Sequence, residues 1–361
     1  LWALDESTKL ITLTDSSASV TYVQPDCEKV VKPELVMRDG VWYGRDADKT
    51  VIVKITVADG EISASEVIMG ASSGAAYDAA LEKARTKAIY GDISTYDAAD
   101  PTKFAGGSGT AEDPYLIANA AQLRYLSSSV NADVDWNGKY FRQTANISLS
   151  SADWQPIGWA LNGEVNGKKT LICSYPFRGN YDGGGYTISG LTIGSAAAPA
   201  DQMTSGLFGL VAGEYTTNEK PTGSEQTVWL KNIRLTGISI NVSTRYETLT
   251  AGLVGNGQYG VFIDNCSVTG TINVTTSESF ARAGGLAGNL LRVAVTNSWT
   301  DVDITAETDA SNVYAGGLYA MDNRVTTVNC YSLGNVTGNS TNNNKVHIGG
   351  IAGQAGGIHI N

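Results

Sequence analysis

The sequence is poor in the residues on which most catalytic and metal sites depend. Its 361 residues include only 2 histidines and 4 cysteines. The cysteines show no C-x-x-C spacing, which argues against a zinc site, and the absence of H-E-x-x-H argues against zincin-type peptidase chemistry. No apolar run approaches about 18 residues, so we expect no transmembrane helix. Lysine and arginine form no cluster, which argues against nucleic-acid and anionic-membrane partners.

The composition instead favours a protein that works outside the cell. The net charge is −11, with 36 acidic against 25 basic side chains. The second half of the chain is rich in Thr, Ser, Asn and Gly and has few charges. This pattern is typical of a secreted or wall-attached bacterial protein, and we expect it to be a monomer.

A repeat of 32 or 33 residues dominates the second half of the chain. A glycine followed by a large aliphatic residue recurs at this spacing after one longer first step, and an asparagine keeps the same spacing. The glycines are Gly206, Gly252, Gly285, Gly317 and Gly350, and the asparagines are Asn232, Asn265, Asn297 and Asn329. Two markers in phase indicate one structural unit per repeat. Because the sequence stops at Asn361, in the middle of a unit, we expect the native protein to continue.

These units predict the coils of a parallel β-helix. Short β-branched runs alternate with Gly, Asn, Ser, Thr and Asp, as strands alternate with turns, and no unit shows helical spacing. Coils stacked about 4.8 Å apart would bury the aliphatic residues in one column and align the asparagines as a turn ladder that satisfies backbone groups. Cys266 and Cys330 share a column with Ser298 between them. They would lie roughly 9–10 Å apart, too far for a disulfide.

The chain divides into four predicted segments: 1–36 with two short strands, 37–95 as a small α+β module, 96–109 as a linker, and 110–361 as the β-helix. In the module, Asp59-Gly60 predicts a hairpin turn, and a stripe of small residues predicts a packed helix: Ala80, Leu81, Ala84 and Ala88. A second short helix after Asn119 is expected to close the first coil of the β-helix. The insertion at 211–227, which lengthens the first repeat, is expected to protrude as a loop.

Several stretches of the β-helix segment show a family resemblance. They are G-T-A-E-D-P-Y-L-I-A-N-A-A-Q-L, F-R-G-N-Y-D-G-G-G-Y-T-I-S-G-L-T-I, S-G-L-F-G and G-G-L-A-G. In order and spacing they resemble the GLUG-motif domains of large bacterial surface proteins, including those beside immunoglobulin A1-cleaving metallopeptidases. The resemblance covers residues 105–361 and implies a right-handed β-helix on a secreted or cell-wall protein. It does not extend to peptidase chemistry.

Residues 37–90 show a weaker resemblance, based on D-G-V-W-Y-G, V-K-I-T-V-A-D-G-E-I and S-S-G-A-A. These patterns are similar to the small FMN-binding domains of bacterial redox proteins. The flavin-acceptor threonine of that family is Ala76 here, so a covalent flavin link is excluded at this position. The resemblance leaves Ser72, Ser73 and Gly74, before a helix, as a candidate cradle for the FMN phosphate. The alternative is a plain helix cap without a cofactor.

Aromatic residues of the first coils are the candidate ligand surface. They are Trp154, Trp159, Tyr175, Tyr181 and Tyr186. Exposed rings with Asn and Asp nearby can stack on sugars or hold a protein ligand. The alternative is that they form the apolar core that closes the coil.

Three polar motifs have simpler explanations than chemistry. The half calcium loop on Asp133, Asp135 and Asn137 lacks the bidentate glutamate that such a loop needs, so we interpret it as a turn. The D-G-G-G run from Asp182 is expected to be a tight turn, since no Lys-Ser/Thr follows it. Asp301 and Asp303 share one strand face without a basic neighbour, and we interpret them as solvated carboxylates.

The expected function is that of an extracellular, adhesin-like stalk or binding surface. It would recognise a host protein or a glycan without catalysis and without a resident cofactor. Two alternatives stay open. One is a redox surface protein that binds FMN through residues 37–90, and the other is a carbohydrate-active β-helix enzyme with a groove along its length.

Overall fold

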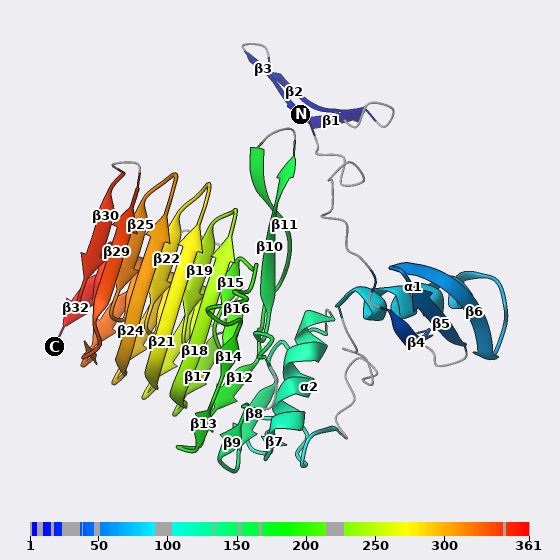
Figure 1. Cartoon of the computed structure of the whole chain (residues 1–361), viewed down its shortest axis with the longest axis horizontal. Helices are drawn as coiled ribbons and strands as arrows, with labels where there is room; N and C mark the ends of the chain where they lie inside the picture. The colour runs from blue at the N-terminus through cyan, green and yellow to red at the C-terminus, as the bar shows by residue number, and fades with distance from the viewer. Residues whose placement is uncertain are drawn as a thin grey trace.

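The computed structural model describes residues 2–5, 10–15, 18–23, 37, 39–46, 51–90, 103–132, 134–150, 153–165, 168–213, 227–341 and 344–360. Strands make up 53% of it and helices 9%, and parallel sheets form a β-solenoid of about 4 turns (Figure 1). The predicted fold class, mainly β with a parallel β-helix after a small α+β module, is therefore confirmed.

Two small antiparallel sheets precede the solenoid in the chain. The first contains β1 (Trp2–Asp5), β2 (Leu10–Asp15) and β3 (Ala18–Val23), and the second contains β4 (Gly40–Arg45), β5 (Ile52–Ala58) and β6 (Glu61–Met69), followed by α1 (Ala75–Tyr90). The sequence predicted two strands in the first unit, and β1 is the additional one. Asp59 and Gly60 link β5 to β6 with φ of 54° and 78°. A two-residue turn with both φ positive is the one that an Asp-Gly hairpin favours.

Small residues let α1 lie directly on the second sheet. Ala80, Ala84 and Ala88 are fully buried, as predicted, whereas Leu81 lies at the edge of the contact and is partly buried. Gly44 of β4 lies below them, and a Cβ there would come within 1.8 Å of the carbonyl oxygen of Ala80. Glycine at this position therefore sets the distance between helix and sheet.

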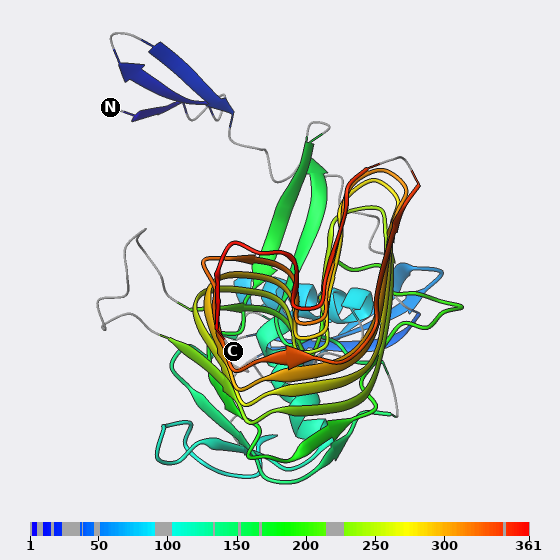
Figure 2. The same cartoon turned by 90° about the vertical axis from the view of Figure 1, so that its left-hand side faces the viewer.

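Three parallel sheets build the solenoid. The 11-stranded sheet contains β7 (Tyr115–Ile117), β8 (Tyr140–Gln143), β12 (Asn180–Asp182), β16 (Phe208–Ala212), β17 (Val228–Lys231), β20 (Val254–Asp264), β23 (Ala287–Thr296), β26 (Tyr319–Asn323), β27 (Thr326–Val328), β31 (Ala352–Gln354) and β32 (Ile358–Ile360). The 8-stranded sheet contains β9 (Ile147–Ser148), β13 (Thr187–Ser189), β14 (Thr192–Ile193), β18 (Arg234–Thr244), β21 (Ser267–Thr276), β24 (Trp299–Thr308), β28 (Tyr331–Ser332) and β29 (Val336–Ser340). The 5-stranded sheet contains β15 (Thr204–Ser205), β19 (Thr248–Ala251), β22 (Ala281–Gly284), β25 (Val313–Gly316) and β30 (Val346–Gly349). Viewed along the stack, the later coils nearly superimpose (Figure 2).

Each coil bends where a glycine precedes a buried aliphatic residue. The aliphatic column is Leu207, Leu253, Leu286 and Leu318, all fully buried, with Ile351 partly buried at its end. The backbone N–H of Leu286 donates to the carbonyl of Leu318 in the next coil at 2.9 Å. A Cβ on Gly285 would lie 2.2 Å from the carbonyl oxygen of Gly317. Close approach between coils therefore requires the glycine, and among the five motif glycines only Gly206 has a positive φ.

The predicted asparagine ladder exists, with a different bonding pattern. Asn232, Asn265, Asn297 and Asn329 all have φ between 51° and 55°, a left-handed conformation that asparagine tolerates better than most residues. The Nδ2 of Asn265 donates to Oδ1 of Asn232 at 2.8 Å, and Asn329 donates to Asn297 at 2.8 Å. We expected the amides to satisfy backbone groups, but they bond to side chains of the preceding coil. The left-handed turn and the hydrogen bonds between side chains of successive coils together explain why an asparagine recurs every 32 or 33 residues.

The helix α2 (Ala120–Asn131) closes the first coil of the solenoid, as predicted (Figure 1). Asn119 caps it by accepting the N–H of Gln122 at 3.0 Å, and Gln122 accepts the N–H of Ala118 at 2.7 Å. These reciprocal bonds satisfy backbone donors at the helix start. The buried side chains of the helix are Leu123, Tyr125, Leu126, Ser127, Ser129 and Val130.

The cysteines of the repeat are small core residues. Cys266 and Cys330 are buried free thiols. Ser298 lies between them, accepting the N–H of Cys266 at 3.0 Å and donating its own N–H to the sulfur of Cys330 at 3.4 Å. The prediction that coil spacing prevents a disulfide between the two is confirmed. Burial raises the pKa of Cys266 to about 12.

One projecting element was not predicted. The strands β10 (Trp159–Val165) and β11 (Lys168–Tyr175) pair antiparallel and extend beyond the coil as a hairpin (Figures 1 and 2). Asn166-Gly167 between two alternating stretches is a hairpin signal, so the sequence did contain the information. The predicted insertion loop lies mostly at 214–226, outside the described residues.

Candidate ligand-binding groove

The outer face of the 11-stranded sheet bears two rows of side chains that cross four neighbouring strands. The parallel register aligns one row, which we call the aromatic row: Tyr140 on β8, Asn180 on β12, Trp229 on β17 and Phe262 on β20. Two residues further along the same strands it aligns the charged row: Arg142, Asp182, Lys231 and Asp264. The residues between the rows point inward, since side chains alternate along a strand. These are Phe141, Tyr181, Leu230 and Ile263, all buried.

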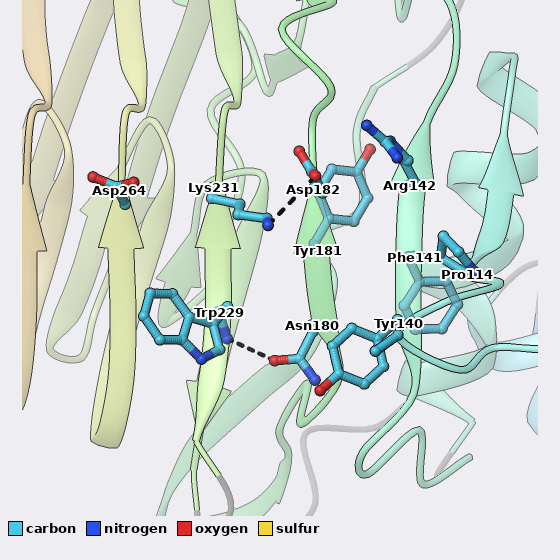
Figure 3. A pocket seen from close by; sticks show the side chains of 11 residues that line it. Pro114, Tyr140, Phe141, Arg142, Asn180, Tyr181, Asp182, Trp229, Lys231 and Asp264 are labelled. Atoms are coloured by element: carbon cyan, nitrogen blue, oxygen red, sulfur yellow. Dashed lines mark hydrogen bonds and ion pairs between the residues drawn. The ribbon is translucent and has the colours of Figure 1, made fainter.

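The aromatic row presents accessible ring faces. Trp229 is 42% exposed and Tyr140 is 36% exposed. The ring of Trp229 stacks on Phe262 with centroids 4.6 Å apart and planes at 17°, which restricts how the indole can rotate. Asn180 links β12 to β17, because its Oδ1 accepts the backbone N–H of Trp229 at 2.9 Å (Figure 3). The result is a fixed aromatic platform on a rigid sheet.

The charged row alternates in sign, and its carboxylates are held by neighbouring groups. Asp182 accepts the N–H of Gly184 at 2.9 Å and the Nδ2 of Asn232 at 2.8 Å through Oδ1, while its Oδ2 lies 3.6 Å from Nζ of Lys231 (Figure 3). These contacts also confirm that the D-G-G-G run is a tight turn, with φ of 61° at Gly184 and 78° at Gly185.

Asp264 is bound in the same manner one repeat later. Its Oδ1 accepts Oγ1 of Thr296 at 2.6 Å and Nδ2 of Asn297 at 2.8 Å. Both carboxylates of the charged row therefore belong to the asparagine ladder as well as to the surface.

The two rows, apart from Phe262, line a groove of about 610 Å³ at the N-terminal end of the sheet, and Phe141 and Tyr181 between the rows also line it. Ala111 and Pro114, in the segment before β7, also line it, and Pro114 lies beside Phe141 at the β8 end (Figure 3). Ring faces, an amide and charges of both signs thus meet in one concave surface. This combination suits a polar ligand that also has apolar faces.

Of the five aromatic residues proposed from the sequence, four lie outside the groove and Tyr181 lies between its two rows. Two of the five, Trp154 and Tyr181, are not exposed. Trp154 is 2% exposed and donates its indole N–H to the carbonyl of Leu207 at 3.1 Å. Tyr181 is 1% exposed, packs edge-on against Phe208, and burial raises the pKa of its hydroxyl. Their expected exposure was wrong, because the first coils need large side chains to fill the end of the solenoid. Both are core residues, the alternative that the sequence left open.

Two of the other three proposed residues form a separate pair. Trp159 and Tyr175 face each other at the base of the β10–β11 hairpin, with ring centroids 5.5 Å apart, and both are half-buried. They lie outside the groove, and a ligand role for them stays a prediction. Tyr186 is 40% exposed, on the turn that leads into β13.

Sequence reasoning missed the groove residues because they are 33 to 49 positions apart. A signal was nevertheless present in the four strands. Each reads outward–inward–outward, with an aromatic or amide residue first, an apolar or aromatic residue second and a charge third: Y-F-R from 140, N-Y-D from 180, W-L-K from 229 and F-I-D from 262. Aligning these triplets would have brought the rows together.

The candidate phosphate cradle of the α+β module is an open turn. Ser72, Ser73 and Gly74 are all exposed and precede α1. Gly74 has a φ of 94°, and its carbonyl accepts the N–H of Asp78 at 3.0 Å. The turn therefore caps the helix, and FMN binding stays a prediction.

The remaining polar motifs have structural partners. Asp303 accepts both the backbone N–H and the Nδ2 of Asn335, at 3.0 and 2.9 Å, and these bonds lower its pKa. Asp135 accepts the N–H of Asn137 at 3.0 Å, as in a turn, while Asp133 lies outside the described residues. Within the described ranges, His, Cys, Asp and Glu form no group of three that could hold a metal ion.

Comparison with known proteins gives partial matches. No model of a known protein family matches the chain, so the resemblance to GLUG-motif domains stays a prediction. A protein of Evansella cellulosilytica named "Putative Gly-rich membrane protein" is 31% identical over 186 residues, which cover 50% of this chain and 17% of that protein. Halomucin of Haloquadratum walsbyi is 29% identical over 208 residues, covering 54% of this chain and 2% of that protein. The chain thus spans a small part of both relatives.

A solved structure also matches. It is the crystal structure of a "putative immunoglobulin A1 protease" from Bacteroides ovatus, 23% identical, with a TM-score of 0.46 over 73% of this chain and 67% of that one. In the part of this chain that the structure describes, neither helix is long and apolar enough to cross a membrane.

Proposed function

We propose that this chain is a non-catalytic binding module of a secreted or cell-surface protein, adhesin-like, which recognises glycan or host ligands through the groove of the 11-stranded sheet. The observation behind it is the platform of Trp229 and Phe262, stacked at 4.6 Å, with the indole of Trp229 exposed and Phe262 half-buried. An exposed tryptophan on a rigid sheet loses little conformational entropy on binding and offers a large apolar face.

The surface location is supported by composition and by relatives. The relatives' names refer to a membrane protein and to a mucin, and both are much longer than this chain. A stack of coils with a net charge of −11 and polar outer faces suits an extended stalk within such a protein. The groove would then present its aromatic row sideways, along the length of the stalk.

Binding is favoured over hydrolysis because of what the groove's carboxylates already do. A glycosidase needs one carboxyl group free to donate a proton and another free to act as base or nucleophile. Asp182 and Asp264 each accept hydrogen bonds from the asparagine ladder, and Asp182 also pairs with Lys231. Both carboxylates stabilise the coil, so we assign them no catalytic role.

The test is an array of oligosaccharides and host-matrix proteins probed with wild type, Trp229→Ala and Trp159→Ala. Trp229→Ala should weaken binding about ten-fold or more, as expected for an aromatic anchor that the bound ligand covers, and Trp159→Ala should leave it unchanged. Far-UV circular dichroism checks that both variants fold. If binding is lost in Trp159→Ala but not in Trp229→Ala, the site lies at the hairpin and not in the groove. Cleavage of a bound glycan by wild type would contradict the proposal.

A further inference from the structure

The groove contains one cation without a counter-charge. Arg142 lies beside Asp182 in the register of β8 and β12, yet the described part of the chain gives its guanidinium no ion pair or hydrogen bond. Asp182 is turned the other way, toward Lys231 and the turn at Gly184 (Figure 3). Its oxygens are thereby occupied on the side away from Arg142.

The other charges of the row sum to −1. Lys231 lies 3.6 Å from Asp182 and offsets it. Asp264, which accepts hydrogen bonds from neutral groups only, keeps its charge three strands from Arg142, roughly 14 Å across the sheet. Such a separation is screened at physiological salt, so the charge that a ligand meets at the β8 end of the groove is the positive one of Arg142. An arginine fork binds a carboxylate through two parallel hydrogen bonds.

A peptide cannot bind this groove by adding a strand to the sheet. Peptides that bind by β-augmentation gain their affinity by pairing with a free strand edge. Here β12 pairs with both β8 and β17, and β17 pairs with both β12 and β20, so only side chains face the ligand. The exposed rings of Tyr140 and Trp229 offer flat faces to the C–H side of a sugar ring, and the polar neighbours offer hydrogen bonds to hydroxyls.

We propose that the groove binds an acidic oligosaccharide, with a sugar carboxylate on the guanidinium of Arg142 and sugar rings on Trp229 and Tyr140. The proposal rests on the proposed function and specifies its ligand class. Arg142 and Trp229 lie two strands apart and two residues apart along the strand direction, roughly 12 Å in all, so the ligand must span more than one sugar. The net charge of −11 repels polyanions at a distance, but at physiological salt such repulsion is screened beyond about 8 Å, and the local contact decides.

The experiment is isothermal titration of the whole chain with tetragalacturonate, tetraguluronate and tetraglucuronate, each against its methyl ester. The ester keeps sugar and linkage and removes the charge. We expect at least one acid to bind about ten-fold or more tightly than its ester, and Arg142→Ala to reduce that acid to the level of the ester. The matched control is Arg234→Ala, which removes an exposed arginine on β18 of the 8-stranded sheet and should leave the affinity for the acid unchanged.

The outcomes separate this inference from the proposed function. Equal binding of acid and ester, lost in Trp229→Ala, would overturn the acidic ligand and leave the binding groove standing. No binding of any of the three acids would also overturn it. Binding of poly-glutamate that depends on Arg142 as strongly as the sugars do would show that the site recognises acidic peptides instead. If the acid binds Trp229→Ala as tightly as wild type, the ligand does not occupy the groove, and both proposals fail.

Discussion

Substitutions at Asn265 test the asparagine ladder because they separate two contributions to stability. Its backbone has a φ of 51°, a left-handed conformation that costs a residue with an ordinary side chain about 1–2 kcal/mol. Its Nδ2 donates to Asn232 at 2.8 Å, and such a bond contributes about 1 kcal/mol net. Asn265→Gly removes only the bond, and Asn265→Ala adds backbone strain. We therefore expect losses of about 1 kcal/mol for glycine and about 2–3 kcal/mol for alanine.

The matched control is Asn273, which lies within strand β21. Its Nδ2 donates to Asn241 at 3.0 Å in the same coil-to-coil manner, but its backbone is extended. Alanine and glycine both remove this bond, and glycine costs about 0.5–1 kcal/mol more than alanine inside a strand. The order of the two variants should therefore reverse between positions 265 and 273.

The assay is urea unfolding followed by far-UV circular dichroism, with midpoints compared at a common slope. Because coils are stabilised mainly by their neighbours, the four variants are compared on the same transition. If alanine at 265 proves as stable as glycine, the left-handed backbone does not constrain this position. The explanation of the repeating asparagine would then fail, even if the side-chain bonds exist.

Two further predictions concern cysteine and flavin. At pH 8.5 Ellman's reagent should label Cys266 only in denaturant, because burial raises its pKa from 9.0 to about 12; rapid labelling of the native protein would contradict its burial. The stability due to the protonated thiol is complete below pH 9 and should fall as pH rises toward 12. Titrated FMN should show no saturable fluorescence change, because Ser73 lies in an exposed turn and Ala76 has no hydroxyl; saturation that vanishes on deleting residues 37–90 would establish a flavin site.

The backbone architecture was predictable because local chemistry repeats along the chain. A glycine is needed where coils touch, as at Gly285, and an asparagine fits where the backbone is left-handed, as at Asn265. Both requirements recur once per coil, so the period of the sequence equals the length of one coil. The hairpin at Asp59-Gly60 and the cap at Asn119 were found for the same reason, since each depends on neighbours within a few residues.

The exposure of the aromatic residues was not predictable in this manner. Trp154 and Tyr181 occur in polar surroundings in the sequence, yet they fill the core at the first coils. Trp229 lies in β17, a strand without any motif that the sequence analysis singled out, and its ring is exposed in the groove. Whether a ring faces in or out depends on strand register and on what closes the end of the stack, and neither is a local property.

The sequence by itself thus determined that the chain coils into a parallel solenoid, because turn and packing requirements are repeated in every unit. Only the tertiary structure decided which side chains share a surface. Arg142 on β8 and Trp229 on β17 belong to strands separated by tens of residues, and parallel pairing through β12 places them on one face. The unmatched charge of Arg142 arises from the same cause, because the asparagine ladder draws Asp182 toward the following coil. The groove forms only when neighbouring coils stack, so no single repeat contains it.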